Sequence, residues 1–138
     1  MKHEFTQRVY YADTDAYEVV WHGTYLRWFE MGRVELCTLI GLDLKTMQAQ
    51  DVAFPVTDIN VKFKSSARLD DTVLVETWIS KVTPLSCVFS QTIKNKETGL
   101  LRSSADVTVV AVNKAGKLYR RFPENVKECF ERGLECKE

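Results

Sequence analysis

The feature that most constrains the fold is the segment TYLRWFEMGRVELCTLI, residues 24–40. At about 100° per residue its apolar side chains cover well over half the circumference of a helix. Gly41 follows as a suitable C′ residue, and Thr24 is the expected N-cap. A helix with so wide an apolar arc has to be enclosed on most of its sides. The segment therefore predicts a buried central helix.

The segments around this helix have the composition and turn spacing of β-strands. The expected strands are 4–12, 54–65, 72–82, 86–94 and 101–113. A short terminal helix is expected at 123–136, and the chain from the central helix to about residue 122 is expected to be strand-like. This order predicts an α+β fold, one antiparallel sheet wrapped around one long helix, with residues 1–138 forming a single domain.

Charge and cysteine spacing exclude several classes of partner. The 19 Lys and Arg residues balance the 19 Asp and Glu residues, which does not favour a nucleic-acid partner. No stretch is long and apolar enough for a signal peptide or a membrane span, so we expect a cytoplasmic protein without membrane insertion. The four cysteines lack zinc-ligand spacing, which predicts buried or half-buried thiols and no metal site.

Two aspartates in YYADTDAYEVVWHGTY precede the helix. Asp15-x-x-Glu18 has the spacing of a capping box, but the residues that follow are poor helix formers. Asp15 is therefore either a turn residue or a carboxylate placed beside the helix N-terminus. Free N–H groups there can polarise a carbonyl, and a nearby carboxylate can act as nucleophile or base.

Other residues each have a structural and a functional interpretation. His22 either packs at the helix entrance or offers its backbone N–H to a substrate carbonyl. Glu30 lies on the apolar arc, either in an ion pair with Arg33 beneath the sheet or lining a polar pocket. Gly32 predicts a close approach of the helix backbone to the sheet. Three basic residues form a solvated edge or contact ligand phosphates: Lys62, Lys64 and Arg68.

The stretch YYADTDAYEVVWHGTYLRWFEMGR resembles the signature of the 4-hydroxybenzoyl-CoA thioesterase family of hotdog-fold proteins. That signature is an Asp, a small residue, Val-Val, an aromatic residue, often His, a Tyr and then Phe-Glu. FPVTDINVKFKSSARLDD is similar to the second strand of the family and the turn after it. The resemblance extends over most of the chain and implies the hotdog fold, a sheet around a central helix.

The resemblance also implies an activity and its residues. The family hydrolyses acyl-CoA thioesters to a carboxylic acid and CoA, and no cofactor is expected because CoA is part of the substrate. Asp15, rather than Asp13, matches the catalytic carboxylate. His22 matches the backbone N–H donor at the helix start, and Tyr25 and Glu30 are expected to bind substrate. A homo-oligomer is expected, a dimer or tetramer with active sites at the dimer interface.

The chain departs from the family at one point, because Tyr17-Glu18 stands where many members have glycine. This bulk predicts a reshaped loop beside the acyl group. Two alternatives to an acyl-CoA thioesterase remain open from the sequence: a thioesterase acting on acyl carrier protein, and a non-catalytic domain that binds acyl ligands.

Overall fold

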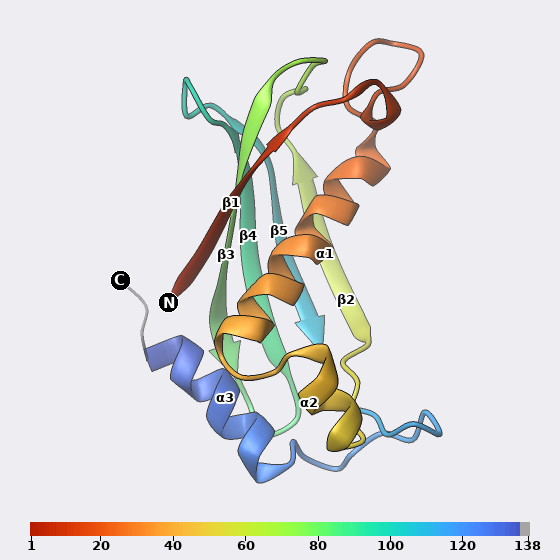
Figure 1. The fold of residues 1–138 in the computed structure, drawn as a ribbon, viewed down its shortest axis with the longest axis vertical. Helices are drawn as coiled ribbons and strands as arrows, with labels where there is room; N and C mark the ends of the chain where they lie inside the picture. Colours follow the sequence, from red (N-terminus) through yellow and green to blue (C-terminus); the bar gives the residue numbers. More distant parts are fainter. Residues whose placement is uncertain (136–138) are drawn as a thin grey trace.

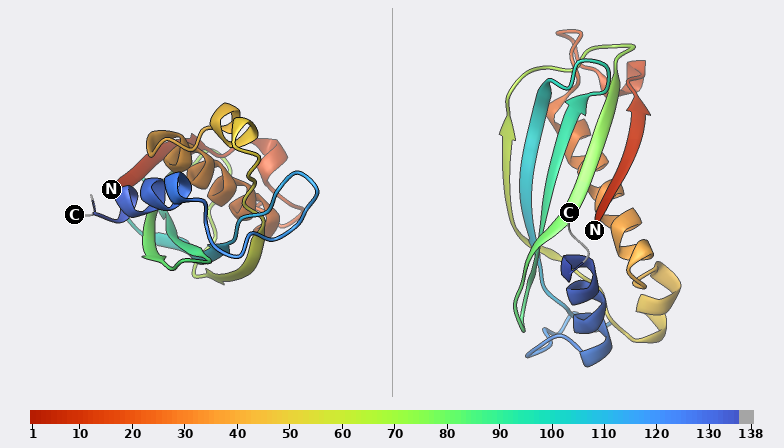
Figure 2. Two further views of the ribbon diagram at one scale, coloured as in Figure 1. Left: turned by 90° about the horizontal axis from the view of Figure 1, so that it is seen from below. Right: turned by 90° about the vertical axis from the view of Figure 1, so that its left-hand side faces the viewer.

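The computed structural model describes residues 1–135. Its elements are β1 (Lys2–Arg8), a 3₁₀ turn (Tyr11–Asp13), α1 (His22–Leu39), α2 (Leu44–Ala49), β2 (Val56–Phe63), β3 (Thr72–Val82), β4 (Cys87–Asn95), β5 (Leu101–Val109) and α3 (Glu124–Glu135). The five strands form one antiparallel sheet in the order β1-β3-β4-β5-β2. The sheet curves around α1, which crosses its inner face obliquely, while α3 lies at the lower end (Figures 1 and 2).

The core lies between α1 and the inner face of the sheet. Trp28, Phe29 and Leu36 of α1 are fully buried, and they pack against apolar side chains such as Val75 and Val107. Because successive side chains of a strand point to opposite faces, the alternate residues form a largely polar outer face. The α+β prediction and the buried central helix are therefore confirmed.

The element boundaries differ from the predictions at the ends of the elements. α1 starts at His22, so Thr24 is not the N-cap; its hydroxyl instead donates to the carbonyl of Asp13 at 3.0 Å. The first strand ends at Arg8 instead of residue 12, and β5 ends at Val109 instead of 113. Gly41 follows the helix with φ +97°, as expected for a C′ residue.

Helix α2 was not predicted, because the whole region after α1 was expected to be strand-like. It has only six residues, less than two turns, which is too short to establish an apolar period of 3.6. α3 is confirmed to Glu135, and the predicted end at residue 136 lies outside the described residues. Cys37 and Cys87 are buried and Cys129 is half-buried, as expected, while Cys136 also lies outside the described residues.

Gly32 lies where the backbone of α1 approaches the sheet closely, as predicted. A Cβ atom at this position would lie 2.3 Å from Thr77 Oγ1 and 3.1 Å from Gln91 Nε2. The buried Gln91 amide donates to the carbonyl of Phe29 and to Thr77 Oγ1, both at 2.8 Å, and accepts from Arg33 at 3.0 Å. The missing side chain of Gly32 therefore gives the sheet access to the helix backbone.

A buried carboxylate lies on the outer face of the sheet. Glu76 of β3 is only 5% exposed because Lys2, Thr92 and Lys94 surround it, with contacts of 3.1, 2.8 and 2.9 Å. Burial by itself raises the pKa of the Glu76 carboxyl. The hydrogen bonds from Lys94, Thr92 and Lys2 outweigh that effect and lower the pKa to about 2. The cluster joins β1, β3 and β4.

We expect the contribution of Glu76 to stability to depend on pH. Its folded pKa lies below the ordinary value of 4.5, so the contribution is complete above about pH 4.5 and is lost as the pH falls through about 2. At about 1.4 kcal/mol per pKa unit this amounts to about 3 kcal/mol. Glu76→Gln should lower the free energy of unfolding in urea by that amount at pH 7. The difference from the wild type should shrink toward zero near pH 2, and an undiminished difference would contradict the prediction.

Candidate active site

A hollow of about 320 Å³ lies at the N-terminal end of α1. It brings together residues from the loop before the helix, from the first turns of α1 and from the end of β2. The lining residues are Asp15, Val20, His22, Tyr25, Phe63, Lys64, Ser65 and Ser66. The structure therefore places three of the predicted site residues, Asp15, His22 and Tyr25, around one space.

Backbone hydrogen bonds hold the loop before α1 in place. The carbonyl of Asp13 accepts from the backbone N–H of Trp21 at 2.9 Å as well as from the Thr24 hydroxyl. The N–H of Val20 donates to the carbonyl of Ala67 at 2.9 Å, which ties the loop to the segment after β2. The backbone of Asp13 thus ties the loop to the start of α1.

Asp15 lies in a tight turn that orients its carboxylate. Its Oδ1 accepts from the backbone N–H of Tyr17 at 2.8 Å, while its own N–H donates to the carbonyl of Val19 at 2.9 Å. This is an Asx-turn, in which the side chain replaces a backbone acceptor. Residues 15–18 therefore form a turn and not a helix start, and the second carboxylate oxygen is left for other partners.

Glu18 has a backbone conformation that favours glycine. Its φ is +65°, in the left-handed region that residues with a Cβ rarely adopt. The backbone N–H of Glu18 donates to the carbonyl of Asp15 at 2.9 Å, which closes the turn in this conformation. The turn thus requires a positive φ, and this chain achieves it with a glutamate beside an exposed Tyr17.

The first turn of α1 provides backbone donors next to Asp15. His22 and Gly23 are its first two residues, so their N–H groups have no acceptor within the helix. The Trp21 ring covers Gly23, because a Cβ at 23 would lie 2.2 Å from a ring carbon. The His22 ring lies 5.0 Å from that of Trp21 and 6.3 Å from that of Phe63. The His22 ring therefore packs at the helix entrance, while the backbone N–H of His22 is available to an acceptor outside the helix.

Tyr25 forms part of the wall of the hollow. It is 3% exposed, and its hydroxyl oxygen accepts from the backbone N–H of Ala67 at 2.9 Å. The segment after β2 is also held by Arg102, which donates to Ser65 Oγ at 3.1 Å and lies 3.7 Å from the carboxylate of Asp71. Burial, more than any other effect, raises the pKa of the Tyr25 phenol.

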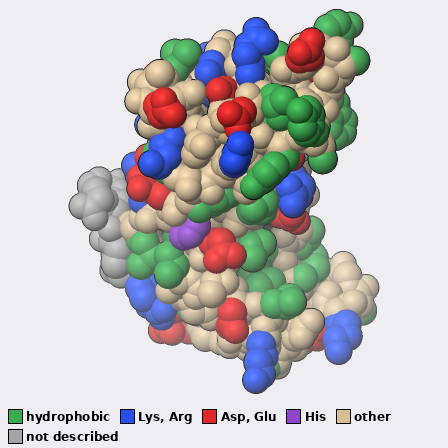
Figure 3. All heavy atoms as spheres, turned by 45° about the horizontal axis from the view of Figure 1, so that its top comes forward, with side chains coloured by type: hydrophobic (Ala, Val, Ile, Leu, Met, Phe, Trp, Pro, Cys, Tyr) green, Lys and Arg blue, Asp and Glu red, His purple; other side chains and the backbone are tan. Residues whose placement is uncertain are grey.

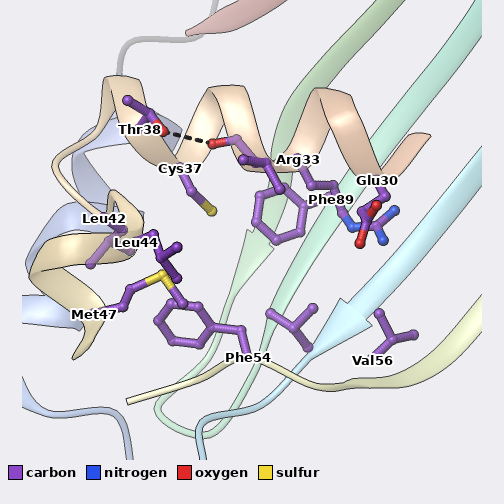
Figure 4. Close-up of a pocket in the computed structure, with 12 residues that line it drawn as sticks. Glu30, Arg33, Cys37, Thr38, Leu42, Leu44, Met47, Phe54, Val56 and Phe89 are labelled. Atoms are coloured by element: carbon purple, nitrogen blue, oxygen red, sulfur yellow. Dashed lines mark hydrogen bonds between the residues drawn. The ribbon is translucent and has the colours of Figure 1, made fainter. Parts of the chain in front are cut away.

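Glu30 lies apart from this hollow. It is exposed and lines a second, more apolar cavity of about 350 Å³ between the second half of α1, α2 and the start of β2 (Figure 4). The interpretation in which Glu30 forms an ion pair with Arg33 is wrong. The Arg33 guanidinium donates a hydrogen bond to Gln91, and no salt bridge within residues 1–135 includes Arg33. Burial lowers the pKa of Arg33. The alternative, in which Glu30 lines a polar pocket, is met only in part, because Glu30 does line a cavity but most of the residues around it are apolar.

The three predicted basic residues do not form one cluster. Lys64 lines the hollow that contains Asp15. Arg68 pairs with Val19 in an isolated bridge, so it borders the same loop. Lys62 pairs with Ser104 on the outer face of the sheet, on the opposite side from Phe63. A view of the end of the molecule that is uppermost in Figure 1 shows Lys and Arg side chains interspersed with carboxylates (Figure 3).

Sequence reasoning missed Phe63, Ser65 and Ser66 as lining residues. Phe63 shares its strand face with Val61, so alternation alone indicated that it points toward α1. The serines carried no signal, because their position depends on how the segment after β2 folds back over Tyr25. Within residues 1–135 no three His, Cys, Asp or Glu side chains are arranged to hold a metal ion, and no helix is long and apolar enough to cross a membrane.

Comparison with known proteins agrees with this architecture. Residues 17–102 match the family described as the thioesterase superfamily. The acyl-CoA thioester hydrolase YbgC of Escherichia coli O6:H1 is 37% identical over 86% of this chain and 88% of its own length. The acyl-CoA thioesterase YbgC of Haemophilus influenzae is 35% identical over 91% of this chain and 92% of its own length.

The solved structures extend the agreement to the fold. The crystal structure of the DHNA-CoA thioesterase of Staphylococcus aureus superposes with a TM-score of 0.86 at 28% identity, covering 97% of this chain and 91% of that one. The expected hotdog arrangement is therefore confirmed. Together with the relatives of similar length, these matches show that the chain belongs to the thioesterase superfamily.

Proposed function

We propose that this protein hydrolyses acyl-CoA thioesters to a carboxylic acid and free CoA, with Asp15 as the catalytic carboxylate. The observation that carries the proposal is that the Asp15 side chain and the first turn of α1, with its available N–H groups, border one hollow. Relatives named as acyl-CoA thioester hydrolases support the reaction. A carboxylate facing a helix N-terminus provides the two elements that attack on a thioester carbonyl requires.

In this proposal the N–H of His22 donates to the thioester carbonyl oxygen and stabilises the oxyanion. As a nucleophile, Asp15 forms a mixed anhydride with the acyl group and CoA leaves as its thiolate; water then hydrolyses the anhydride. As a general base, Asp15 takes a proton from an attacking water and passes it to the departing thiolate. The Tyr17 N–H orients the carboxylate in both cases.

Substrate contacts beyond the reacting atoms follow from the same placement. We propose that Lys64 and Arg68, which border the hollow and its loop, contact CoA phosphates. Lys62 lies on the outer face of the sheet and does not line the hollow, so the placement gives no support for the same role there. The reaction as proposed needs no metal or other cofactor, since CoA is part of the substrate, and the expected location of the protein remains the cytoplasm.

The edge strand β2 supports an oligomer. Val56, Ile59 and Phe63 are 44%, 44% and 51% exposed, so an unpaired edge carries apolar side chains. We propose that β2 pairs with β2 of a second copy and that the active sites lie at this interface. Light scattering should give the mass of a dimer or a tetramer for the wild type and a smaller mass for Ile59→Lys. A monomeric wild type would contradict the proposed pairing of β2 strands.

The experiment that tests the function is a panel of aliphatic and aromatic acyl-CoAs, with free thiol measured as it forms. Release of CoA from at least one member, well above the rate without protein, is the expected result. The same acyl groups on an acyl carrier protein serve as the comparison. Preference for the carrier thioester, or saturable binding without thiol release, would contradict the proposal.

A further inference from the structure

The hydroxyl group of Tyr25 has one hydrogen-bond function that the protein leaves unused. Its oxygen accepts from Ala67 N–H, but in the hydrogen bonds of residues 1–135 its own hydrogen has no acceptor. A phenol is both donor and acceptor, and a buried donor without a partner is unfavourable. Tyr25 is only 3% exposed and lines the hollow that contains Asp15 and His22.

The position of Tyr25 in the helix directs this group toward the reacting atoms. Tyr25 follows His22 by three residues, so its Cα lies about 4.5 Å further along the helix axis. Helical side chains lean toward the N-terminus and cover the turn before their own Cα. The Tyr25 side chain therefore extends back toward the level of the His22 N–H. The rings of Trp28 and Phe63, at 5.8 and 5.7 Å, hold it in place.

We propose that the O–H of Tyr25 donates a hydrogen bond to the thioester carbonyl oxygen, as a second donor beside the His22 N–H. This inference rests on the proposed function, because it assigns a partner to the same carbonyl. The Ala67 N–H supports the role, since a hydrogen bond received by the phenol oxygen strengthens the one that its hydrogen gives. Two donors share the charge that develops on the oxygen as the tetrahedral intermediate forms.

The surroundings of Tyr25 keep it a donor. Burial raises the pKa of the phenol, so the group stays protonated and cannot serve as a base at neutral pH. The charged groups that face it act in opposite directions: Arg102 lowers the pKa and Asp71 raises it. The Ala67 N–H bond also lowers the pKa, which makes the O–H a stronger donor without ionising it.

The contact can be measured without turnover. The probe is an acyl-CoA analogue in which CH₂ replaces the thioester sulfur and the carbonyl carbon is ¹³C, observed by difference infrared spectroscopy. Replacing Tyr25 with 3-fluorotyrosine keeps the acceptor for Ala67 but makes the O–H more acidic, so the carbonyl band should move to lower frequency than in the wild type. In Tyr25→Phe the band should move to higher frequency. One band position in all three proteins would overturn the proposal.

Kinetics provide the second readout. Removing one oxyanion donor lowers kcat by about 100-fold or more, so Tyr25→Phe should show that loss with KM changed only a few-fold. A purely structural role would lower stability and leave the band unmoved. If the wild type releases CoA but the carbonyl band of the bound analogue does not change with the substitutions at Tyr25, only the Tyr25 contact is overturned. A Tyr25-dependent band without thiol release from any acyl-CoA supports the contact and overturns the hydrolysis. An analogue that does not bind overturns both.

Discussion

Replacing Asp15 with asparagine is expected to lower the rate of CoA release by at least about 100-fold, because the amide can neither attack the thioester nor take a proton from water. The fold should survive. The amide oxygen of the introduced asparagine can still accept from the Tyr17 N–H, the bond that Asp15 Oδ1 accepts at 2.8 Å in the wild type. Stopped-flow thiol detection measures the rate, and urea unfolding measures the stability of the same preparation.

The neighbouring aspartate provides a matched control. Asp13 Oδ2 accepts from the backbone N–H of Tyr10 at 2.9 Å, and asparagine keeps that bond as well. Asp13→Asn therefore makes the same change of charge two residues away and should keep the wild-type rate within a few-fold. Near-normal turnover in Asp15→Asn, or equal losses in both variants, would remove Asp15 from the mechanism.

Gly32→Ala is expected to destabilise the protein by about 2–3 kcal/mol, although alanine is the better helix former by about 1 kcal/mol. The added Cβ would lie 2.3 Å from Thr77 Oγ1, so either the buried Thr77 side chain has to rotate or α1 and β3 have to move apart. That movement also strains the bonds from Gln91 to the carbonyl of Phe29 and to Thr77. The midpoint of urea unfolding measures the loss.

Two further variants isolate the clash. Gly133, in α3, is another helical glycine, but a Cβ there would lie 3.0 Å from Cδ1 of Ile79 and 3.3 Å from Cγ2 of Ile40, both terminal methyl groups of side chains. Gly133→Ala should therefore change stability by less than about 1 kcal/mol. In a Thr77→Ala background the clashing oxygen is gone, so the cost of Gly32→Ala should fall by at least about 1 kcal/mol. A Gly32→Ala variant as stable as the wild type would show that no close contact exists.

Much of the fold could be predicted because it depends on local periodicity. The apolar arc of 24–40 needs a surrounding sheet whatever its strand order, and the predicted strands agree with β1 to β5 to within a few residues. The predictions of helices and their ends are wrong where the local sequence pattern is weak or ambiguous. Six residues are too few to show the helical period of α2, and Thr24 has the composition of an N-cap although its hydroxyl bonds to Asp13 from inside the helix.

The site could be predicted in part for the same reason. Asp15, His22 and Tyr25 lie within eleven residues of one another in the sequence. The turn and the first helical turn therefore bring them together through local bonds. Glu30 and Arg33 also have helical spacing, but Gln91 from β4 takes the guanidinium. Helical spacing shows that two side chains can meet and does not show which competing partner a distant strand supplies.

By itself, then, the sequence determined a buried central helix inside an antiparallel sheet, a carboxylate just before that helix and membership of a thioesterase family. Only the tertiary structure decided that Lys64 borders the site while Lys62 faces outward, that Glu30 belongs to a separate cavity, and that the buried Tyr25 hydroxyl holds Ala67. The physical reason is the separation in sequence of the residues that interact. Helical and strand periods follow from neighbouring residues, whereas sheet register and the path of the segment after β2 depend on contacts between residues that are far apart in the chain.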